Sequence, residues 1–311
     1  MGRRFLIDTD TGSDDAVALV MALQHPGVQV EAITIVAGNV PVEQGVQNAL
    51  YTVELCQKSA LVYAGMPAPL SRSLETAQNV HGRDGMGDIG LPLDGRSPAP
   101  AHAIPVLIVT IHRFAGEITQ VTLGPLTNNA AALRQDPSIA AAVQACIIMG
   151  GTGQGHGNVT PVAEYNFWAD PDAAQVVFAS GLPIKMVGWD ISRIHAVFDA
   201  EDTAALRAIG TPLAHYCVDI QKGVQQFALH TTRLRGFDLP DPIAMAIALD
   251  PSVATRTEHW FVEIETMSPL CRGQSVVDRL NLMGQKPNAE VVVEASRTRF
   301  LRILHDAVRG T

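Results

Sequence analysis

Cysteine is scarce in this sequence, and none of it occurs in a paired motif. The four cysteines of the 311 residues are far apart, with no CxxC pair. This spacing disfavours both a disulfide-stapled secreted domain and a cysteine-rich zinc site. We expect reduced thiols, buried in the case of Cys56 and Cys146, which lie within apolar segments.

Long apolar runs are also absent. No segment approaches the roughly 20 apolar residues that a membrane-spanning helix needs. The opening MGRRFLID carries two arginines, but its apolar stretch ends at Asp8, too early for a secretory signal peptide. We therefore expect a soluble, cytoplasmic protein with no membrane partner.

Positive charge is in deficit. Lysine and arginine amount to 22 residues against 31 aspartates and glutamates, which gives a formal net charge of −9. This balance disfavours a surface that binds nucleic-acid phosphates or an acidic membrane. The remaining composition, 47% apolar and 17% charged, is that of an ordinary globular protein. It leaves room for a small ligand in a local pocket.

Short β-rich runs alternate with longer helical patterns, as in folds where helical crossovers join parallel strands. We predict an α/β fold with a mostly parallel, mixed central sheet flanked by helices, open and Rossmann-like, in one domain covering residues 1–311. The predicted strands are 4–8, 28–38, 105–111, 120–124, 141–151, 183–190, 258–266 and 289–295, and the predicted helices are 14–25, 41–57, 170–181 and 299–309. Residues 65–104 are rich in Pro, Gly and Ser and are predicted to form a long, functional loop.

Four carboxylates, those of Asp8, Asp10, Asp14 and Asp15, follow the first predicted strand and open the first predicted helix. Ligands of open α/β sheets bind beyond the carboxyl ends of the strands, where this cluster would lie. A helix N-terminus stabilises an acidic residue by only about 0.3–1 kcal/mol, whereas hard cations such as Ca²⁺ and Mg²⁺ bind carboxylate oxygens directly. The cluster therefore predicts a metal site rather than helix capping with solvated charge. Zinc is disfavoured because HExxH and Cys/His clusters are absent.

A phosphatase of the haloacid dehalogenase type is an alternative interpretation of the same segment. DxDxT after a strand would make Asp8 the nucleophile and Asp10 the acid/base, with Mg²⁺ between them. That mechanism needs a phosphate-binding lysine and a later acidic pair. Lysine occurs only at positions 58, 185, 222 and 286, and no later Asp-Asp pair follows a predicted strand. This alternative is the weaker one.

The segment DTDTGSDDA (8–16) matches DxDxGxDDA at every specified position, and AGN, LGPLTN, MGG…GN…AEYN and Asp-Pro follow at 37–39, 123–128, 149–166 and 241–242. Together these segments resemble the nucleoside hydrolase family of the inosine–uridine type, in the family's order and roughly its spacing. The resemblance extends from residue 5 to at least 250. It implies the nucleoside hydrolase fold and an enzyme that hydrolyses the N-glycosidic bond of ribonucleosides to ribose and free base.

The resemblance also assigns roles to residues. It implies a Ca²⁺ ion bound by Asp10, Asp15, Asp241 and the backbone carbonyl of Leu123. Asp10 would take a proton from a water molecule held by that ion, and water would attack an oxocarbenium-like sugar. The implied substrate-binding residues are Asp14, Asn39, Asn158, Glu164 and Asn166, which would hydrogen-bond the ribose, and Met149, which would line the sugar pocket.

Position 240 departs from the family. Many members carry a histidine just before the late aspartate, thought to help protonate the departing base, and this sequence has Pro240. His81 matches a family loop residue that faces the base and is the candidate leaving-group acid. His230 and Arg233 lie where the family places a mobile wall over the base, and either is an alternative donor.

Two further points stay open at this stage. Trp168 and Trp189 could stack on a purine, but core packing is the better interpretation for both. A binding protein on the same fold, which holds a nucleoside or sugar without turnover, is the alternative to a hydrolase. The resemblance implies a homodimer or homotetramer, and the sequence determines neither the assembly nor the preferred base.

Overall fold

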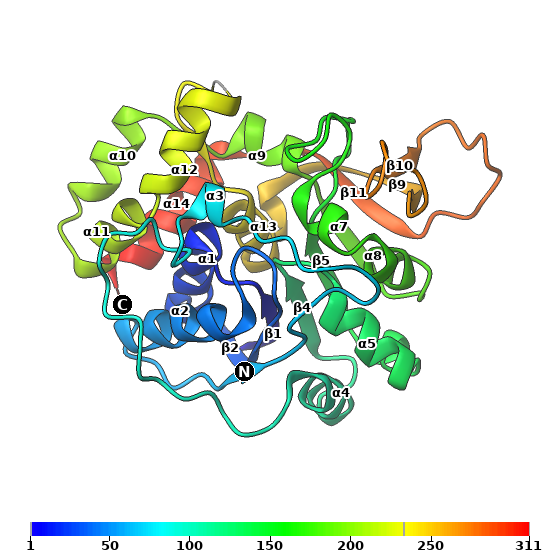
Figure 1. The fold of residues 1–311 in the computed structure, drawn as a ribbon, viewed down its shortest axis with the longest axis horizontal. Helices are drawn as coiled ribbons and strands as arrows, with labels where there is room; N and C mark the ends of the chain where they lie inside the picture. Colours follow the sequence, from blue (N-terminus) through cyan, green and yellow to red (C-terminus); the bar gives the residue numbers. More distant parts are fainter. Residues whose placement is uncertain (1, 233, 311) are drawn as a thin grey trace.

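The computed structural model describes residues 2–232 and 234–310. Within these ranges a nine-stranded sheet has the order β10-β9-β11-β6-β5-β4-β1-β2-β3 (Figure 1). Its strands are β1 (Arg3–Thr9), β2 (Val28–Ile35), β3 (Val62–Ala64), β4 (Ile118–Thr122), β5 (Ala145–Met149), β6 (Ile184–Val187), β9 (Ala254–Ile264), β10 (Ser275–Asp278) and β11 (Ala289–Ala295). β9 pairs antiparallel with β10 and β11, and the other pairs are parallel. The prediction of a mostly parallel, mixed sheet is confirmed.

Helices connect the parallel strands. They are α1 (Ser13–Gln24), α2 (Val42–Leu55), α3 (Gln78–His81), α4 (Ala103–Arg113), α5 (Thr127–Gln135), α6 (Ile139–Ala142), α7 (Tyr165–Ala169), α8 (Pro171–Phe178), α9 (Trp189–His195), α10 (Ala200–Arg207), α11 (Pro212–Asp219), α12 (Lys222–Phe227), α13 (Pro240–Leu249) and α14 (Arg297–Arg309). A π-helical turn, η1 (Ala228–Thr232), continues α12, a 3-10 turn, η2 (Pro251–Val253), follows α13, and β7 (Val197–Phe198) pairs with β8 (Phe237–Asp238). Among the described residues, no helix combines the length and apolarity needed to span a bilayer.

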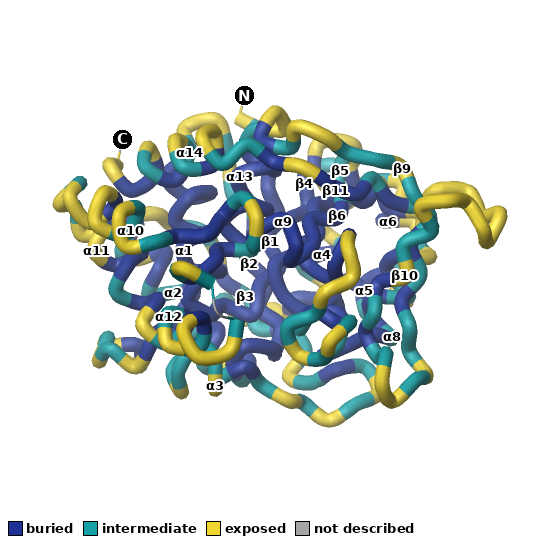
Figure 2. The backbone as a smooth tube through the Cα atoms, turned by 90° about the horizontal axis from the view of Figure 1, so that it is seen from above, coloured by how far each residue is buried: buried dark blue, intermediate teal, exposed yellow. Residues whose placement is uncertain are grey.

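The hydrophobic core lies in two layers, one on each face of the sheet. Side chains of β1 alternate between them, with Phe5 and Ile7 in one layer and Leu6 in the other. The first layer holds residues of α1, α2, α13 and α14, and the second holds residues of α4, α5 and α8. The interior of the molecule is buried throughout this stack (Figure 2). Helix α1 lies at its centre, and every one of its residues is buried.

The predicted strand at 105–111 is wrong, because these residues lie in α4. The β-branched residues of PVLIVTI favour a strand, but the apolar side chains follow a helical spacing. Ile104, Leu107 and Ile111 are buried on one face, while Val109 is 64% exposed. His102 caps the helix by accepting a hydrogen bond from the backbone N–H of Ile104. Burial against the sheet therefore outweighs the local strand propensity.

Candidate active site

The carboxyl ends of four neighbouring parallel strands meet at one edge of the sheet. Asp10 follows β1, Asn39 follows β2, Leu123 follows β4, and Met149 ends β5. Because β5, β4, β1 and β2 are adjacent in the sheet, residues far apart in the chain come together here. This edge is where open α/β sheets bind their ligands.

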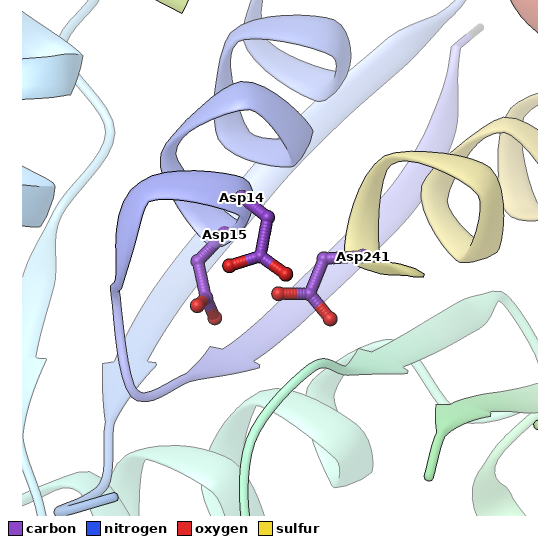
Figure 3. Close-up of side chains that lie close together, drawn as sticks. All are labelled: Asp14, Asp15 and Asp241. Carbon is purple, nitrogen blue, oxygen red and sulfur yellow. The ribbon is translucent and has the colours of Figure 1, made fainter. Parts of the chain in front are cut away.

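Three buried carboxylates converge at this edge (Figure 3). Asp14 and Asp15 belong to the first turn of α1, and Asp241 belongs to the first turn of α13. One carboxylate oxygen from each lies within 4.8 Å of the others. The two helix N-termini therefore direct their positive ends toward a single acidic cluster.

Asp10 lies in the loop just before this cluster and is fully buried. Its Oδ2 accepts a 2.6 Å hydrogen bond from the backbone N–H of Asn39, and its Oδ1 has no hydrogen-bond partner. Two glycines make room for the carboxylate. A Cβ on Gly38 would lie 2.1 Å from Oδ2, and a Cβ on Gly124 would lie 2.7 Å from Oδ1. The backbone thus closes around Asp10 from two loops.

Asp15 has a second role at the start of α1. Its Oδ1 accepts a hydrogen bond from the hydroxyl of Thr9, and its Oδ2 accepts bonds from the backbone N–H of Gly12 and the side-chain amide of Asn39. The carboxylate is therefore held in one orientation by donors from the segment between β1 and α1 and from the loop that follows β2. A ligand that binds Asp15 would meet a preorganised group.

The charges of the cluster are not balanced by the surrounding protein. Burial, followed by repulsion from Asp15, raises the pKa values of Asp10, Asp14 and Asp241 well above the usual range. Two unit charges 4 Å apart repel by about 4 kcal/mol at an effective dielectric constant of 20, several times what a helix N-terminus returns. Within residues 2–232 and 234–310, no lysine or arginine forms an ion pair with these aspartates.

The donor set fits a hard divalent cation. Oδ1 of Asp10 and Oδ1 of Asp14 are buried with no hydrogen-bond partner, and Asp14, Asp15 and Asp241 can offer oxygens to one point. All available donors are oxygens, as Ca²⁺ and Mg²⁺ require, and no thiol belongs to the group. The prediction of a metal site at the aspartate segment is thus supported by the cluster that the structure forms.

Asp8 does not share in the cluster, although the sequence places it with the other three. Its Oδ1 accepts hydrogen bonds from the hydroxyl of Thr34 and the amide of Asn128, and its Oδ2 accepts one from the amide of Asn129. Burial raises its pKa to about 7, while the bonds from Thr34 and Asn128 lower it. Because β1 is still in strand conformation here, the side chain of Asp8 lies on one face of the sheet, against Asn128 and Asn129 of α5, rather than beyond the end of the strand.

A cavity of about 330 Å³ opens above the carboxylates, within the range of small-molecule sites. Its lining contains these predicted site residues: Asp14, Asn39, His81, Leu123, Met149, Asn158, Glu164, Asn166 and Asp241. Asp10 and Asp15 are fully buried and do not line it. The structure therefore brings the sequence motifs to one chamber.

Glu164 and Asn166 occupy the start of α7 on one wall of the cavity. Glu164 caps the helix, its carboxylate accepting backbone N–H bonds from Gly151 and Asn166 at 2.8 and 2.9 Å. Burial raises the pKa of Glu164 to about 7, although these hydrogen bonds favour the charged carboxylate and lower the pKa. The amide of Asn166 donates to the carbonyl of Leu123 at 2.7 Å. The carbonyl assigned to the metal thus lies beside a residue assigned to the sugar.

His81 is the last residue of α3 and faces the same cavity. Its Nδ1 lies 3.1 Å from Oγ of Ser13 and 3.6 Å from Oδ1 of Asp14. Burial lowers its pKa to about 4, so the imidazole is neutral near pH 7 and does not offset the carboxylates. Pro240 also lines the cavity, and it carries no side-chain proton donor.

The two alternative donors are not placed in the cavity. His230 lies in η1, is exposed and is not part of the cavity lining. Arg233 falls outside the described residues. Among the residues that the structure describes, His81 is therefore the only imidazole that lines the cavity.

The structure differs from the expectation for Trp168. This residue is half-buried and lines the cavity, with the guanidinium of Arg272 stacked 3.9 Å from its ring centroid. Trp189 is buried in the core, as expected. Successive residues of a helix point in different directions, so within α7 Phe167 packs in the core beside the sheet while its neighbour Trp168 faces the cavity.

Several cavity residues were not identified from the sequence. They are Glu75, Thr76, Ala77, Asn79 and Val80 from the predicted loop 65–104, and Val159, Tyr165 and Phe227 from elsewhere. The prediction that residues 65–104 form a functional loop pointed to the first group, without naming its members. Phe227 ends α12 and carried no motif, so nothing in the sequence singled it out.

Comparisons with known proteins agree with this geometry. The model of the family described as inosine-uridine preferring nucleoside hydrolase matches residues 5–302. The chain is 37% identical to the pyrimidine-specific ribonucleoside hydrolase RihA of Escherichia coli O9:H4 (strain HS), over 99% of each chain. It is 34% identical to the pyrimidine-specific ribonucleoside hydrolase RihB of Escherichia coli (strain SE11), over 99% of this chain and 97% of that one.

Solved structures of similar proteins have the same fold. A plant nucleoside hydrolase superposes with a TM-score of 0.94 at 31% identity, covering 100% of both chains. A purine-preferring ribonucleoside hydrolase from Gardnerella vaginalis superposes with a TM-score of 0.91 at 30% identity, covering 99% of this chain and 98% of that one. The phosphatase alternative is thereby excluded. The chain belongs to the inosine-uridine preferring nucleoside hydrolase family and is a ribonucleoside hydrolase.

Proposed function

We propose that this protein hydrolyses ribonucleosides to ribose and free base in a Ca²⁺-dependent reaction in which Asp10 is the general base and His81 protonates the departing base. One observation carries the proposal. A cluster of buried aspartates, with unpartnered oxygens on Asp10 and Asp14, lies at a cavity large enough for a nucleoside, and its members Asp14 and Asp241 line that cavity. Asp10, Asp15, Asp241 and the carbonyl of Leu123 would hold the ion.

The polar groups on the cavity walls suit a ribose. Asp14 belongs to α1 and Asn39 to the loop after β2, whereas Asn158, Glu164 and Asn166 come from the segment between β5 and the first turn of α7. Ribose carries three hydroxyl groups that can donate to carboxylates and accept from amides. A substrate that lacked one of these hydroxyls would leave a buried group unpaired, at a cost of about 1–3 kcal/mol. The cavity is therefore built to select the sugar.

When bound, Ca²⁺ supplies positive charge that lowers the pKa of a coordinated water molecule. Oδ1 of Asp10 is buried and has no partner, so it is free to accept the proton that water loses as it attacks C1′. The carboxylates also stabilise the positive charge that develops on the sugar ring. That charge is absent from the neutral substrate, so the stabilisation acts on the transition state.

Departure of the base requires a proton, because the electron pair of the breaking bond stays with the base. Pro240 has none to give, and His81 is the imidazole that lines the cavity. We therefore assign leaving-group protonation to His81. General acid catalysis of this kind typically contributes about 10²–10⁴-fold in rate.

The names of two relatives, RihA and RihB, favour pyrimidine ribonucleosides as the substrates. RihA and RihB are both described as pyrimidine-specific, at 37% and 34% identity. Two observations favour purines instead. The solved purine-preferring enzyme is 30% identical to this chain, and Trp168 lines the cavity, where a purine ring could stack on it. We propose uridine and cytidine as the preferred substrates, and a homodimer or homotetramer as the assembly, which light scattering on the purified protein would measure.

The test is ribose release from uridine, cytidine, inosine, guanosine and adenosine, first after EDTA treatment and then with Ca²⁺ restored. We expect release that depends on Ca²⁺ and is fastest with the two pyrimidine nucleosides. Release that is equal with and without the ion would contradict the metal assignment. If none of the five is cleaved although uridine binds, the protein is a nucleoside-binding protein on the hydrolase fold.

A further inference from the structure

A chain of buried polar groups leads from His81 away from the cavity. Nδ1 of His81 lies 3.1 Å from Oγ of Ser13, and Oγ of Ser13 lies 3.1 Å from Oε1 of Gln221. Ser13 and Gln221 are both fully buried, and neither lines the cavity. Neither residue was singled out by the sequence, since Ser13 fills an unspecified position of DxDxGxDDA. The function described above leaves both unexplained.

The orientation of the Gln221 amide follows from its second hydrogen bond. Its other terminal atom lies 2.9 Å from the backbone carbonyl oxygen of Ser13. A carbonyl oxygen only accepts, so this atom must be Nε2, and Oε1 must face the hydroxyl of Ser13. Oε1 also only accepts, so the single hydroxyl proton of Ser13 is donated to Gln221.

The direction of the last bond is then decided. Because the hydroxyl proton is used, Oγ of Ser13 can only accept from His81, and Nδ1 of His81 must carry a hydrogen. The carboxylate of Asp14, 3.6 Å from the same nitrogen, favours the same arrangement. We propose that Gln221, acting through Ser13, is a positioning residue that fixes the Nδ1–H tautomer of His81, so that Nε2 is the ring nitrogen that exchanges a proton with the substrate.

Close packing keeps Gln221 in place. It precedes α12, and the next residue but one, Gly223, contacts the backbone of α3. A Cβ on Gly223 would lie 2.6 Å from the carbonyl oxygen of Val80 and 3.1 Å from the carbonyl carbon of His81. Helix α12 therefore lies directly on the backbone that carries His81. The same helix ends at Phe227, which lines the cavity.

The catalytic consequence rests on the proposed role of His81. Burial lowers the pKa of His81 to about 4, so the ring rests as the neutral Nδ1–H form and must first take a proton from solvent onto Nε2. As the bond between C1′ and the base breaks, its electron pair stays with the base, which takes this Nε2 proton. His81 is left neutral with its hydrogen on Nδ1, which is the tautomer that Ser13 and Gln221 stabilise, and it regains a proton from solvent. Without Gln221, the hydroxyl of Ser13 could donate to Nδ1 and would stabilise the opposite tautomer.

The first test reads the tautomer directly. In Ca²⁺-loaded enzyme labelled with ¹⁵N-histidine, two-bond ¹H–¹⁵N spectra at pH 8 distinguish Nδ1–H from Nε2–H, and a His81→Asn spectrum identifies the signals. We expect the Nδ1–H tautomer in the unmodified enzyme and a mixture of tautomers in Gln221→Met. The matched control is Gln226→Met, which changes an exposed glutamine of helix α12 and should leave the spectrum unaltered.

The second test separates leaving-group chemistry from folding. Nucleosides need a proton on the departing base, whereas p-nitrophenyl riboside releases a stable anion. Gln221→Met should lower kcat for uridine about tenfold with KM little changed, and should alter kcat for the nitrophenyl riboside less than twofold. Ser13→Ala keeps the backbone carbonyl that anchors Gln221 and should likewise lower kcat for uridine but not for the nitrophenyl riboside. Ser13→Thr keeps the hydroxyl group and should retain the uridine turnover of the unmodified enzyme.

Each contrary result has a distinct meaning. An Nε2–H tautomer in the unmodified enzyme, or an unchanged tautomer in Gln221→Met, would overturn the relay. Equal losses on both substrates would assign Gln221 a merely structural role and overturn it as well. A His81→Ala enzyme with full uridine turnover would instead overturn the acid role of His81 assigned under the proposed function, together with the catalytic consequence of the relay.

Discussion

The backbone N–H of Asn39 donates a 2.6 Å hydrogen bond to Oδ2 of Asp10 and leaves Oδ1 of the same carboxylate buried without a partner. One oxygen is thus fixed by the protein and the other is available to a ligand. An unpaired buried oxygen costs free energy, and a group bound at Oδ1 would offset that cost. Asp10 is therefore poised to act on a bound group.

Asp10→Asn should lower kcat for uridine by about 10³-fold, because an amide cannot accept the proton of the attacking water. The ribose-binding residues are unchanged, so the variant should still bind uridine. Steady-state kinetics and calorimetric titration would measure the two effects. A variant that retains a tenth of the normal kcat would show that Asp10 is not the general base.

Ca²⁺ should stabilise the fold, and more so at higher pH. The raised pKa values of Asp10, Asp14 and Asp241 mean that the ion-free folded protein holds protons that the unfolded chain has lost. Its stability therefore falls as pH rises above the unfolded values near 4, and Ca²⁺ must displace those protons to bind.

At a Ca²⁺ concentration of about 100 Kd, the gain is about 2.7 kcal/mol, or roughly 4 °C in Tm. We expect this shift at pH 8 and a much smaller one at pH 5.5, as measured by thermal unfolding. Asp241→Asn should abolish most of it at both values. A shift of the same size at both pH values would argue against carboxylate ligands.

Asp8→Asn should reduce stability without impairing catalysis. Both oxygens of Asp8 accept hydrogen bonds, including those from the amides of Asn128 and Asn129, so an amide group in their place would face another donor. The expected loss is about 1–3 kcal/mol in the free energy of unfolding, measured with urea. The folded variant should keep its kcat and its response to Ca²⁺. Loss of the Ca²⁺ response would place Asp8 in the metal site after all.

Gly124→Ala should impair catalysis through Asp10. The new Cβ would lie 2.7 Å from Oδ1 of Asp10, which must move, and a displacement of about 1 Å can cost about 10²-fold in rate. The matched control is Gly27→Ala at an exposed position, where the new Cβ would meet only ring atoms of the partly buried His25, at 3.1 Å and beyond. Equal activities of the two variants would show that the position of Asp10 tolerates this shift.

The periodicity of the sequence was sufficient for most of the framework. Alternating β-rich and helical runs predicted the parallel sheet, because the apolar pattern of each run matches the burial of a strand or helix. Residues 105–111 were assigned the wrong type of element, since β-branched side chains suit both structures and only packing against the sheet decides between them. Local pattern failed where local preference was ambiguous.

The sequence by itself also determined which motifs belong to the site. DTDTGSDDA, AGN and AEYN carry side chains that the cavity brings together. What only the tertiary structure decided is how those side chains are oriented. Asp8 faces α5 while Asp14 and Asp15 meet Asp241, although all three early residues lie within eight positions.

The tertiary structure likewise decided the surroundings of the proton donor. Ser13 and Gln221 are 208 positions apart, and no short-range pattern links them or either one to His81. Their hydrogen bonds depend on how α12 packs against α3 and the start of α1. Motifs record the groups that chemistry requires, but contacts between distant segments arise from packing, which a single sequence does not display.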